Sequence, residues 1–381
     1  MDRIKYFCYY DTIDAPVERG YVLAATNKLD YIWKTLNNIG YSVDVISVSC
    51  CTDTRWIYAS SGIKQIGEFN TLRLFPSFGG PKVIRILGRY YLWACFFLWF
   101  ILNVGRGEKV VVYHSLGYCR LLMFLQFLTG CKIIGEIEEI YQDVLPQKKS
   151  VKRAEKNFIK KCDAYIFPTH LLDQNLNPTH KPSVLVHGIY EVEKPRNCSW
   201  NDSDIHVVYA GTFDPSKGGA LAAVTSAKFL PKGYHLHVCG FGTEHETLSI
   251  RDLIEKINSI SEATVTYDGL MKGEEFIEFL QKCKIGLSTQ NPTAAFNSTS
   301  FPSKVLTYLA NGLRVVTIRI PVLELSRIGA FLFYYDKQSP KEIAMAIMDC
   351  AHVSHSLPPN EVLNRLDVQF KCDLARVLKH V

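Results

Sequence analysis

Short apolar runs alternate with longer amphipathic segments along the first half of the chain. Apolar residues recur at helical spacing over residues 21–39, and Gly40 ends this run, as glycine does just past a helix. Buried strands are predicted at residues 4–10, 42–48, 109–113, 132–137 and 164–168. Strands and helices that alternate in this way form a parallel sheet with helices on both faces.

A second alternating series follows a polar stretch at residues 191–204, which we interpret as an interdomain linker. Its strands are predicted at residues 205–210, 235–239, 264–267, 285–288, 315–318 and 331–334, with a late helix at 340–351. The predicted fold class is therefore α/β, with two tandem Rossmann-like domains. Ligands bind at the carboxyl ends of the strands in such sheets, so two facing domains would enclose a cleft.

The expected domains are an N-terminal domain at residues 1–190 and a C-terminal domain at residues 205–360. A helix at residues 361–381 is expected to pack back on the N-terminal domain. The chain has 381 residues, of which 48% are apolar and 21% charged, so it is globular rather than disordered. Its 12 cysteines include no Cys-x-x-Cys pair, which is typical of a cytoplasmic protein.

Positive charge is concentrated in the first half of the chain. Residues 1–190 hold 23 basic and 16 acidic side chains, and residues 55–109 alone hold eight basic and two acidic ones. No recognised nucleic-acid motif accompanies this charge, so a nucleic-acid partner is not expected. Basic side chains interleaved with apolar ones instead suit an anionic membrane surface. The residues expected to face it are Arg73, Lys82, Arg85 and Arg89.

Residues 90–104 form an uncharged run of 15 residues, bracketed by Arg89 and Arg106. A membrane-spanning helix needs about 20 residues, so we interpret this run as a buried helix of the N-terminal domain. The expected location is therefore cytoplasmic and peripheral, at the inner face of the membrane.

Two segments have features of a phosphate-binding site. In the first, a strand ends at Gly211, and Lys217 precedes two glycines that lead into a helix. In the second, Pro302 precedes Ser303 and Lys304 at the start of a helix. Glycine permits close backbone approach, and a helix N-terminus with a lysine attracts a diphosphate. Taken singly, each segment could also be an ordinary strand-to-helix turn.

Together the segments resemble a known family. The matching stretches are AGTFDPSKGG at 210, HVCGFGTEHE at 237, VTYDGLMKGEEFIEFLQKCKIGLS at 265 and FPSKVLTYLANGLRVV at 301. In this order and spacing, the C-terminal half resembles the group 1, or family 4, glycosyltransferases with the GT-B fold. The N-terminal half is similar more faintly, through Arg19-Gly20-Tyr21, VVYHS at 111, EIEEIY at 136 and VHGIY at 186.

The resemblance implies an enzyme of polysaccharide biosynthesis that moves a sugar from a nucleotide-diphosphate donor to a polysaccharide or lipid-linked saccharide. It implies retention at the anomeric carbon, with no metal or other cofactor. The implied catalytic residues are Lys217, at the diphosphate, and His114, near the transferred sugar. The implied donor-binding residues are Gly20, Gly211, Thr212, Asp268, Leu270, Ser303, Lys304 and Thr307. Arg19, Glu138 and Glu139 are implied on the acceptor side.

Three positions depart from the family pattern. Thr212 stands where the family often has an arginine, and Thr299 and Thr307 stand where it often has two glutamates. Thr307 retains only a neutral hydroxyl for the donor ribose. A GT-B nucleotide-sugar epimerase and a non-catalytic GT-B scaffold protein therefore remain alternatives.

Two further patterns contain residues of the metal-ligating types. Asp202 and Asp204 form an Asp-x-Asp, the metal motif of a different glycosyltransferase fold, but they lie in the linker ahead of a strand. His235 and His237 alternate on one predicted strand, with no third ligand in view. We interpret these histidines as packing residues, and no metal site is expected.

Overall fold

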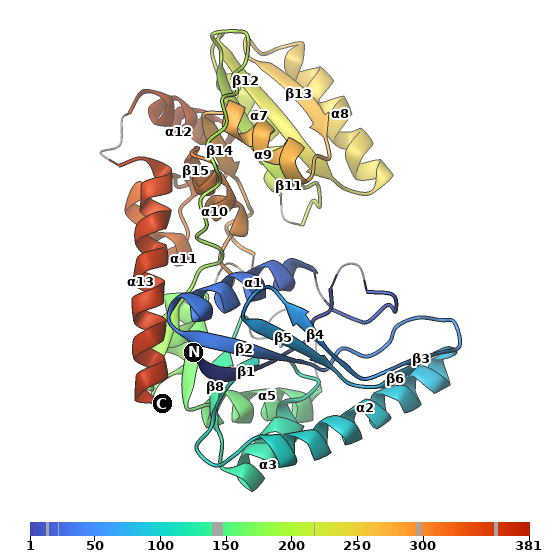
Figure 1. Cartoon of the computed structure of the whole chain (residues 1–381). Helices are drawn as coiled ribbons and strands as arrows, with labels where there is room; N and C mark the ends of the chain where they lie inside the picture. The colour runs from blue at the N-terminus through green and yellow to red at the C-terminus, as the bar shows by residue number, and fades with distance from the viewer. Residues whose placement is uncertain are drawn as a thin grey trace. The chain divides into compact units, whose positions relative to one another are not determined.

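The computed structural model describes residues 1–12, 15–21, 23–138, 148–216, 218–294, 297, 299–353 and 357–381. The chain divides into two compact units (Figure 1). Unit 1 comprises Met1–Ile189 together with Phe370–Val381, and unit 2 comprises Tyr190–Gln369.

Unit 1 is built on an eight-stranded sheet in the order β10-β9-β8-β7-β1-β2-β5-β4, which is parallel except for β4. The strands of unit 1, including β3 and β6 outside this sheet, are β1 (Asp2–Cys8), β2 (Tyr41–Ser47), β3 (Ile57–Ala59), β4 (Gly62–Ile66), β5 (Asn70–Leu74), β6 (Ser77–Gly79), β7 (Lys109–Tyr113), β8 (Lys132–Glu136), β9 (Ala164–Phe167) and β10 (Ser183–Leu185). Its helices are α1 (Leu23–Asn38), α2 (Lys82–Asn103), α3 (Cys119–Thr129), α5 (Lys149–Lys161) and α6 (His170–Leu176).

The stretch between β2 and α2 departs from the simple alternation that the sequence predicts. There β4 pairs antiparallel with β5, and β3 pairs antiparallel with β6 in a separate two-stranded sheet. These strands are only three to five residues long, and β4 has no buried residue. Strands of three to five residues are too short for a clear periodic pattern, so the sequence did not predict them.

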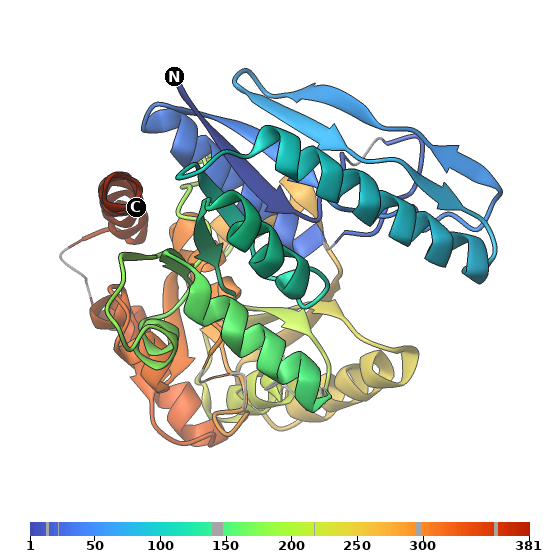
Figure 2. The ribbon, with the colours of Figure 1, turned by 90° about the horizontal axis from the view of Figure 1, so that it is seen from below.

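Helices α2, α3 and α5 lie side by side on one face of the unit 1 sheet (Figure 2). Leu92, Phe96 and Phe100 form one buried stripe on α2, and the Phe7 ring contacts both phenylalanines. Gly88 extends this stripe by one turn, and the rest of α2 is exposed or half-buried. The helix predicted at residues 90–104 is therefore present, but it is buried along one stripe only. Among the described residues, α2 is the one helix long and apolar enough to cross a membrane.

Unit 2 has a six-stranded, fully parallel sheet in the order β13-β12-β11-β14-β15-β16. Its strands are β11 (Ile205–Thr212), β12 (Tyr234–Phe241), β13 (Thr264–Gly269), β14 (Ile285–Ser288), β15 (Arg314–Ile318) and β16 (Phe333–Tyr335). Its helical segments are α7 (Gly219–Ser226), η1 (Ala227–Phe229), α8 (Glu244–Asn258), α9 (Gly273–Lys282), α10 (Ser303–Ala310), α11 (Pro321–Glu324), η3 (Gly329–Phe331) and α12 (Pro340–His352). Counted within the unit, this strand order is 3-2-1-4-5-6, the Rossmann order. The predicted fold class is confirmed.

The polar segment at residues 191–204 belongs to unit 2. The backbone N–H of Glu193 donates to the carbonyl of Ala310 at 3.0 Å, and that of Arg196 donates to Oε1 of Gln281 at 2.8 Å. Its side chains are exposed or half-buried, and these backbone hydrogen bonds attach the segment to α9 and α10.

The last helix, α13 (Pro359–His380), begins in unit 2 and ends in unit 1. Within unit 1, the Phe370 ring stacks on Tyr31 at 5.9 Å, and Lys109 donates to the carbonyl of Leu378.

Candidate functional site

A pocket of about 330 Å³ lies at the carboxyl ends of the strands in unit 2. Its position beside β11 matches the ligand-binding edge of a doubly wound sheet, where strand order reverses between β11 and β14. The lining residues are Ala210, Gly211, Cys239, Gly240, Phe241, Leu270, Met271, Phe276, Ser303, Lys304, Thr307 and Tyr308.

Two glycines allow the strand ends to approach one another beneath this pocket. A Cβ at Gly240, whose φ is +152°, would lie 1.8 Å from the carbonyl oxygen of Gly211. A Cβ at Gly211 would lie 2.9 Å from Nζ of Lys304 and 3.2 Å from the hydroxyl of Tyr209. Gly211 thus leaves room for the lysine ammonium at the end of β11.

Helix α10 brings positive charge to the pocket. It begins at Ser303, and the Pro302 side chain forms no capping hydrogen bond there. The first backbone N–H groups of a helix have no partner within it, and its dipole favours an anion at this end. Lys304 adds a full charge in the same turn. The site therefore has the cationic features that bind phosphate.

Tyr308 fixes α10 relative to the sheet. Its hydroxyl accepts a hydrogen bond from the backbone N–H of Ala210 at 2.8 Å and donates to the carbonyl of Leu287 at 3.3 Å. The ring is fully buried beneath Gly286, where a Cβ would lie 2.3 Å from it. Tyr308 belongs to the FPSKVLTYLANGLRVV stretch at 301, but the sequence alone did not indicate that it joins two strands.

The structure brings together five of the predicted donor-binding residues, namely Gly211, Leu270, Ser303, Lys304 and Thr307. The hydroxyl of Thr307 donates to the carbonyl of Ser303 at 3.3 Å. Phe241, Met271 and Phe276 also line the pocket, but in the sequence their apolar side chains are indistinguishable from core residues.

The remaining predicted donor residues of unit 2 do not line this pocket. Oγ1 of Thr212 accepts from the backbone N–H of Asp214 at 3.2 Å. The carboxylate of Asp268 contacts His237 at 3.2 Å and Thr266 at 3.0 Å. Lys217, the predicted catalytic lysine, lies outside the described residues.

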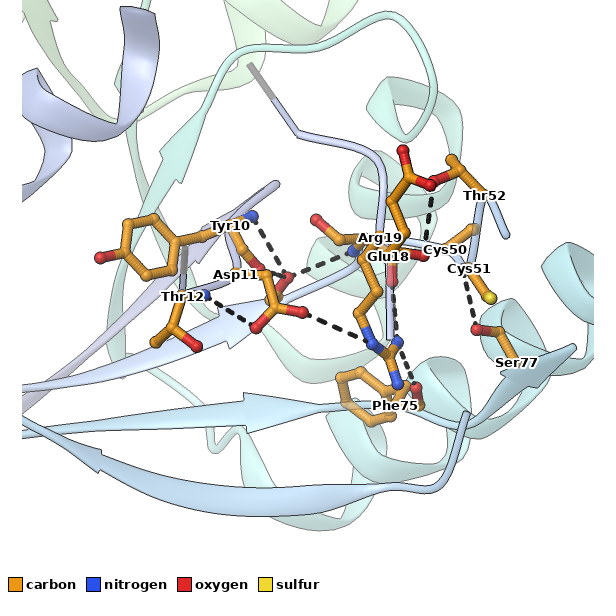
Figure 3. Close-up of polar contacts among 12 residues, drawn as sticks. Tyr10, Asp11, Thr12, Glu18, Arg19, Cys50, Cys51, Thr52, Phe75 and Ser77 are labelled. Atoms are coloured by element: carbon orange, nitrogen blue, oxygen red, sulfur yellow. Dashed lines mark hydrogen bonds and ion pairs between the residues drawn. The ribbon is translucent and has the colours of Figure 1, made fainter. Parts of the chain in front are cut away.

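In unit 1, the loop before Gly20 is anchored by Arg19 (Figure 3). Arg19 is buried, and its guanidinium donates to the carbonyls of Ser49 at 3.0 Å, Phe75 at 2.9 Å and Ser60 at 3.2 Å. Nε of Arg19 also lies 3.8 Å from the carboxylate of Asp11. These contacts, all within unit 1, hold the loop in place, and the acceptor-side role of Arg19 stays a prediction.

Gly20 follows directly, and its N–H donates to the carbonyl of Cys50 at 2.9 Å. A Cβ there would lie 3.2 Å from Cγ2 of Thr52. A second cavity of about 450 Å³ borders the same loop, and Asp11, Arg19 and Arg55 contribute to its walls. Gly20 is thus part of a fixed loop beside a cavity of unit 1.

His114 follows β7 and is only 1% exposed. Its Nε2 lies 3.5 Å from Oε1 of Glu155, and its ring stacks on Phe158 at 6.1 Å, so α5 covers it.

Glu138 forms an ion pair with Lys28, and Glu139 lies outside the described residues. The catalytic role of His114 and the acceptor role of Glu138 stay predictions.

Beside them lies Glu136, a titratable group that the sequence analysis did not single out. Its carboxyl is fully buried at the end of β8 and accepts a hydrogen bond from the hydroxyl of Tyr6. Burial, followed by the nearby charge of Glu138, raises the pKa of Glu136 to about 8. Its carbonyl accepts from the backbone N–H of His114 at 2.8 Å.

The four basic residues predicted at a membrane differ in their surroundings. The Arg73 guanidinium lies over the Trp99 ring at 5.3 Å, and Arg85 donates to the carbonyl of Thr52 at 3.2 Å. Lys82 and Arg89 are exposed. Arg73 and Arg85 are half-buried and held by these contacts, so Lys82 and Arg89 are the more accessible pair by exposure.

A larger basic and apolar surface lies on α2, α3 and α5. Its exposed apolar side chains are Leu98, Ile101, Leu102, Phe124, Phe127 and Leu128. Helix α5 adds the exposed basic side chains of Lys149, Arg153, Lys156, Lys160 and Lys161. A cavity between α3 and α5 is lined by both kinds, including Phe127 and Lys161. We call this set of residues the α2-α3-α5 surface.

The fold and the pocket define a protein with two Rossmann-like domains of the GT-B fold. Solved structures with this fold match essentially the whole chain. Sucrose-phosphate synthase from Thermosynechococcus elongatus has a TM-score of 0.65 at 12% identity, covering 100% of this chain and 98% of that chain. HepE from Anabaena, in complex with UDP and glucose, has a TM-score of 0.61 at 11% identity, covering 100% of both chains.

A third similar structure is the UDP-forming α,α-trehalose-phosphate synthase from Burkholderia xenovorans, in complex with glucose-6-phosphate. Its TM-score is 0.60 at 9% identity, covering 98% of each chain. The chain matches no family model and no curated protein sequence. At these identities the likeness establishes the fold.

Proposed function

We propose that this protein is a glycosyltransferase of the hexosyltransferase class, which moves a sugar from a nucleotide-diphosphate donor to a saccharide acceptor. The observation that carries the proposal is Lys304, at the start of α10, beside Gly211 in the unit 2 pocket. The similar structures, which include a UDP-forming synthase and a protein bound to UDP and glucose, support this substrate class.

The proposed reaction breaks the bond between the anomeric carbon and a phosphate oxygen. Negative charge then grows on the leaving diphosphate, and preorganised cations and N–H groups stabilise it. Lys304 and the N-terminus of α10 supply them, and Lys217 is predicted to add a further cation. This arrangement supports transfer without a divalent metal at the donor.

For a retaining transfer, the acceptor oxygen bonds to the anomeric carbon on the face that the phosphate leaves. The acceptor proton passes to an oxygen of the departing phosphate. No protein base is needed in this route, so His114 would orient or stabilise the sugar.

We further propose that the acceptor is lipid-linked and that unit 1 docks on an anionic membrane. The α2-α3-α5 surface supports this, because it combines exposed apolar side chains with basic ones at its edge. Apolar side chains enter the headgroup region, and each nearby lysine or arginine adds about 1 kcal/mol of attraction to anionic lipid. The protein would then be peripheral, at the cytoplasmic face.

The experiment that tests the function is a thermal-shift screen with UDP, ADP, GDP and their hexose conjugates. A glycosyltransferase is expected to show a raised Tm with one nucleotide and to hydrolyse or transfer the sugar of that donor. Binding without turnover on any tested saccharide would favour the scaffold alternative, and interconversion of the donor sugar would favour the epimerase. Transfer should persist in EDTA at a temperature well below the Tm.

A further inference from the structure

Three histidines from neighbouring strands meet on one face of the unit 2 sheet. The register of β11 and β12 sets His206 opposite His235, and His237 follows two residues later on the same face. One ring nitrogen from each histidine lies within 4.8 Å of the other two. Across the part of the chain that the structure describes, this is the one group of three or more His, Cys, Asp or Glu residues with such spacing.

Two carboxylates fix the outer nitrogens of two of these rings. Nε2 of His206 lies 2.7 Å from Oδ1 of Asp202, and Nδ1 of His237 lies 3.2 Å from Oδ2 of Asp268. A carboxylate only accepts hydrogen bonds, so each of these nitrogens carries the ring proton. A histidine that donates its outer N–H to a carboxylate is the usual arrangement of a metal-binding histidine.

The inner nitrogens of the same rings face one another. Nδ1 of His206 lies 2.9 Å from Nε2 of His237. Since the outer nitrogens hold the protons, both inner nitrogens of the neutral rings carry lone pairs. Two lone pairs at this distance repel unless a proton or a metal cation lies between them. Tetrahedral Zn²⁺ holds two nitrogens about 3.3 Å apart, so this pair would need to open by only about 0.4 Å.

His235 provides a third imidazole, which a tetrahedral cation needs and a shared proton does not. Its ring stacks on His237 at 4.1 Å, so it must turn to bring a nitrogen lone pair to the ion. The hydroxyl of Thr266 contacts Nε2 of His235 at 3.1 Å and the Asp268 carboxylate at 3.0 Å. The third ring is therefore tied to the same network that orients His237.

Packing holds the rings in place while leaving a route from solvent. The Trp200 ring stacks on His206 at 4.7 Å and on His237 at 4.8 Å. His206 and His237 are buried, whereas His235 is half-buried and the Asp202 side chain is 50% exposed. An ion can therefore enter past His235 and Asp202.

We infer that His206, His235 and His237 form a binding site for a borderline divalent metal of the Zn²⁺ class, with Asp202 and Asp268 as positioning residues. Imidazole ligands suit Zn²⁺ rather than Mg²⁺ or Ca²⁺. Gly211 and Gly240 line the unit 2 pocket at the carboxyl ends of β11 and β12, whereas the three histidines lie closer to the amino ends of these strands. The metal would thus fasten the segment that carries Trp200 and Asp202 to the sheet, apart from sugar transfer.

The test is a Zn²⁺ titration of the full chain after EDTA treatment and desalting, in competition with a chromophoric chelator. We expect one equivalent bound per chain and a rise of about 5 °C in Tm. Co²⁺ should give the visible absorption of a tetrahedral complex. The variant His206→Gln/His237→Gln should lose the bound equivalent, the Tm rise and the Co²⁺ spectrum, whereas His245→Gln, at an exposed histidine of α8, should keep all three.

Asp202→Asn keeps every ring and gives a second, milder test. Loss of its charge should weaken Zn²⁺ binding about 10- to 100-fold, because the carboxylate orients His206. The inference is overturned if the wild type binds no equivalent of Zn²⁺, or if the double variant or Asp202→Asn binds it as tightly as the wild type does. It is also overturned if Co²⁺ remains in its pale octahedral form.

Discussion

The ammonium group of Lys304 lies 4.3 Å from the centre of the Tyr209 ring. A lysine above an aromatic face gains a cation–π attraction, so the ring helps to hold this charge beside the donor pocket. Because Tyr209 lies in β11 and Lys304 in α10, the contact joins the two elements that form the proposed phosphate site.

Lys304→Ala should therefore reduce sugar transfer far more than it reduces stability. Loss of one group that stabilises a developing anion typically lowers turnover about 100-fold or more. Turnover and Tm of the variant would be measured with the donor that the nucleotide screen identifies. Lys256→Ala, at an exposed lysine of α8, is the matched control. Near-normal transfer by a folded Lys304→Ala protein would remove this lysine from the mechanism.

Two glycine variants should separate ligand binding from folding. In Gly211→Ala, the new Cβ meets the mobile end of Lys304, so the lysine is displaced, the KM for the donor rises and Tm changes little. In Gly240→Ala, the Cβ meets the Gly211 carbonyl in a backbone conformation that disfavours side chains, so Tm falls markedly. Calorimetry and donor titration would measure both effects. The same Tm for the two variants would contradict this assignment.

Glu136 should make stability depend on pH. Its folded pKa of about 8 lies above its ordinary value of 4.5, so the folded state binds the extra proton between these values. The stability that protonated Glu136 contributes is fully present below pH 4.5 and is lost as pH rises through about 8. Relative to the wild type, Glu136→Gln should become more stable by up to about 1.4 kcal/mol per pH unit across this window.

Urea unfolding at pH 5, 6, 7 and 8 would measure this difference. Glutamine keeps the shape of the protonated carboxyl and an oxygen that accepts from the Tyr6 hydroxyl. Glu262→Gln, at an exposed glutamate, provides the control. If the free energies of unfolding of the wild type and Glu136→Gln run parallel with pH, Glu136 does not take up a proton on folding.

The α2-α3-α5 surface gives a fourth prediction. Leu102 and Phe127 are 82% and 79% exposed, and burying one such side chain in a bilayer contributes about 1.5–3 kcal/mol. Leu102→Ser/Phe127→Ser should therefore reduce binding to anionic vesicles at least 10-fold. Lys160→Gln/Lys161→Gln should weaken it by about 2 kcal/mol, an effect that added salt would mask.

Vesicle sedimentation would measure binding, with transfer to a soluble acceptor analogue as the measure of an intact enzyme. Leu248→Ser, at an exposed leucine of α8, should leave both unchanged. Equal binding to neutral and anionic vesicles would exclude electrostatic docking. If only detergent releases the protein, α2 inserts into the bilayer instead.

The sequence by itself determined the local elements and their class. The spacing of apolar residues placed β7 at residues 109–113 and β14 at residues 285–288, with bounds that the structure reproduces. It also placed Gly211 at a strand end and Lys304 in a first helical turn, which suffices to indicate an anion site. These features depend on neighbours within a few residues, which is why the sequence contains them.

Tertiary structure alone decided what distant residues do together. The three carbonyls that bind the Arg19 guanidinium lie 30 to 56 residues away in the sequence, so only the folded chain shows that Arg19 anchors its loop. His206 and His235 meet only because β11 and β12 pair in one particular register. A shift of one residue would turn one of them to the other face of the sheet. Strand register and helix packing depend on the whole core, so no local pattern could reveal these contacts.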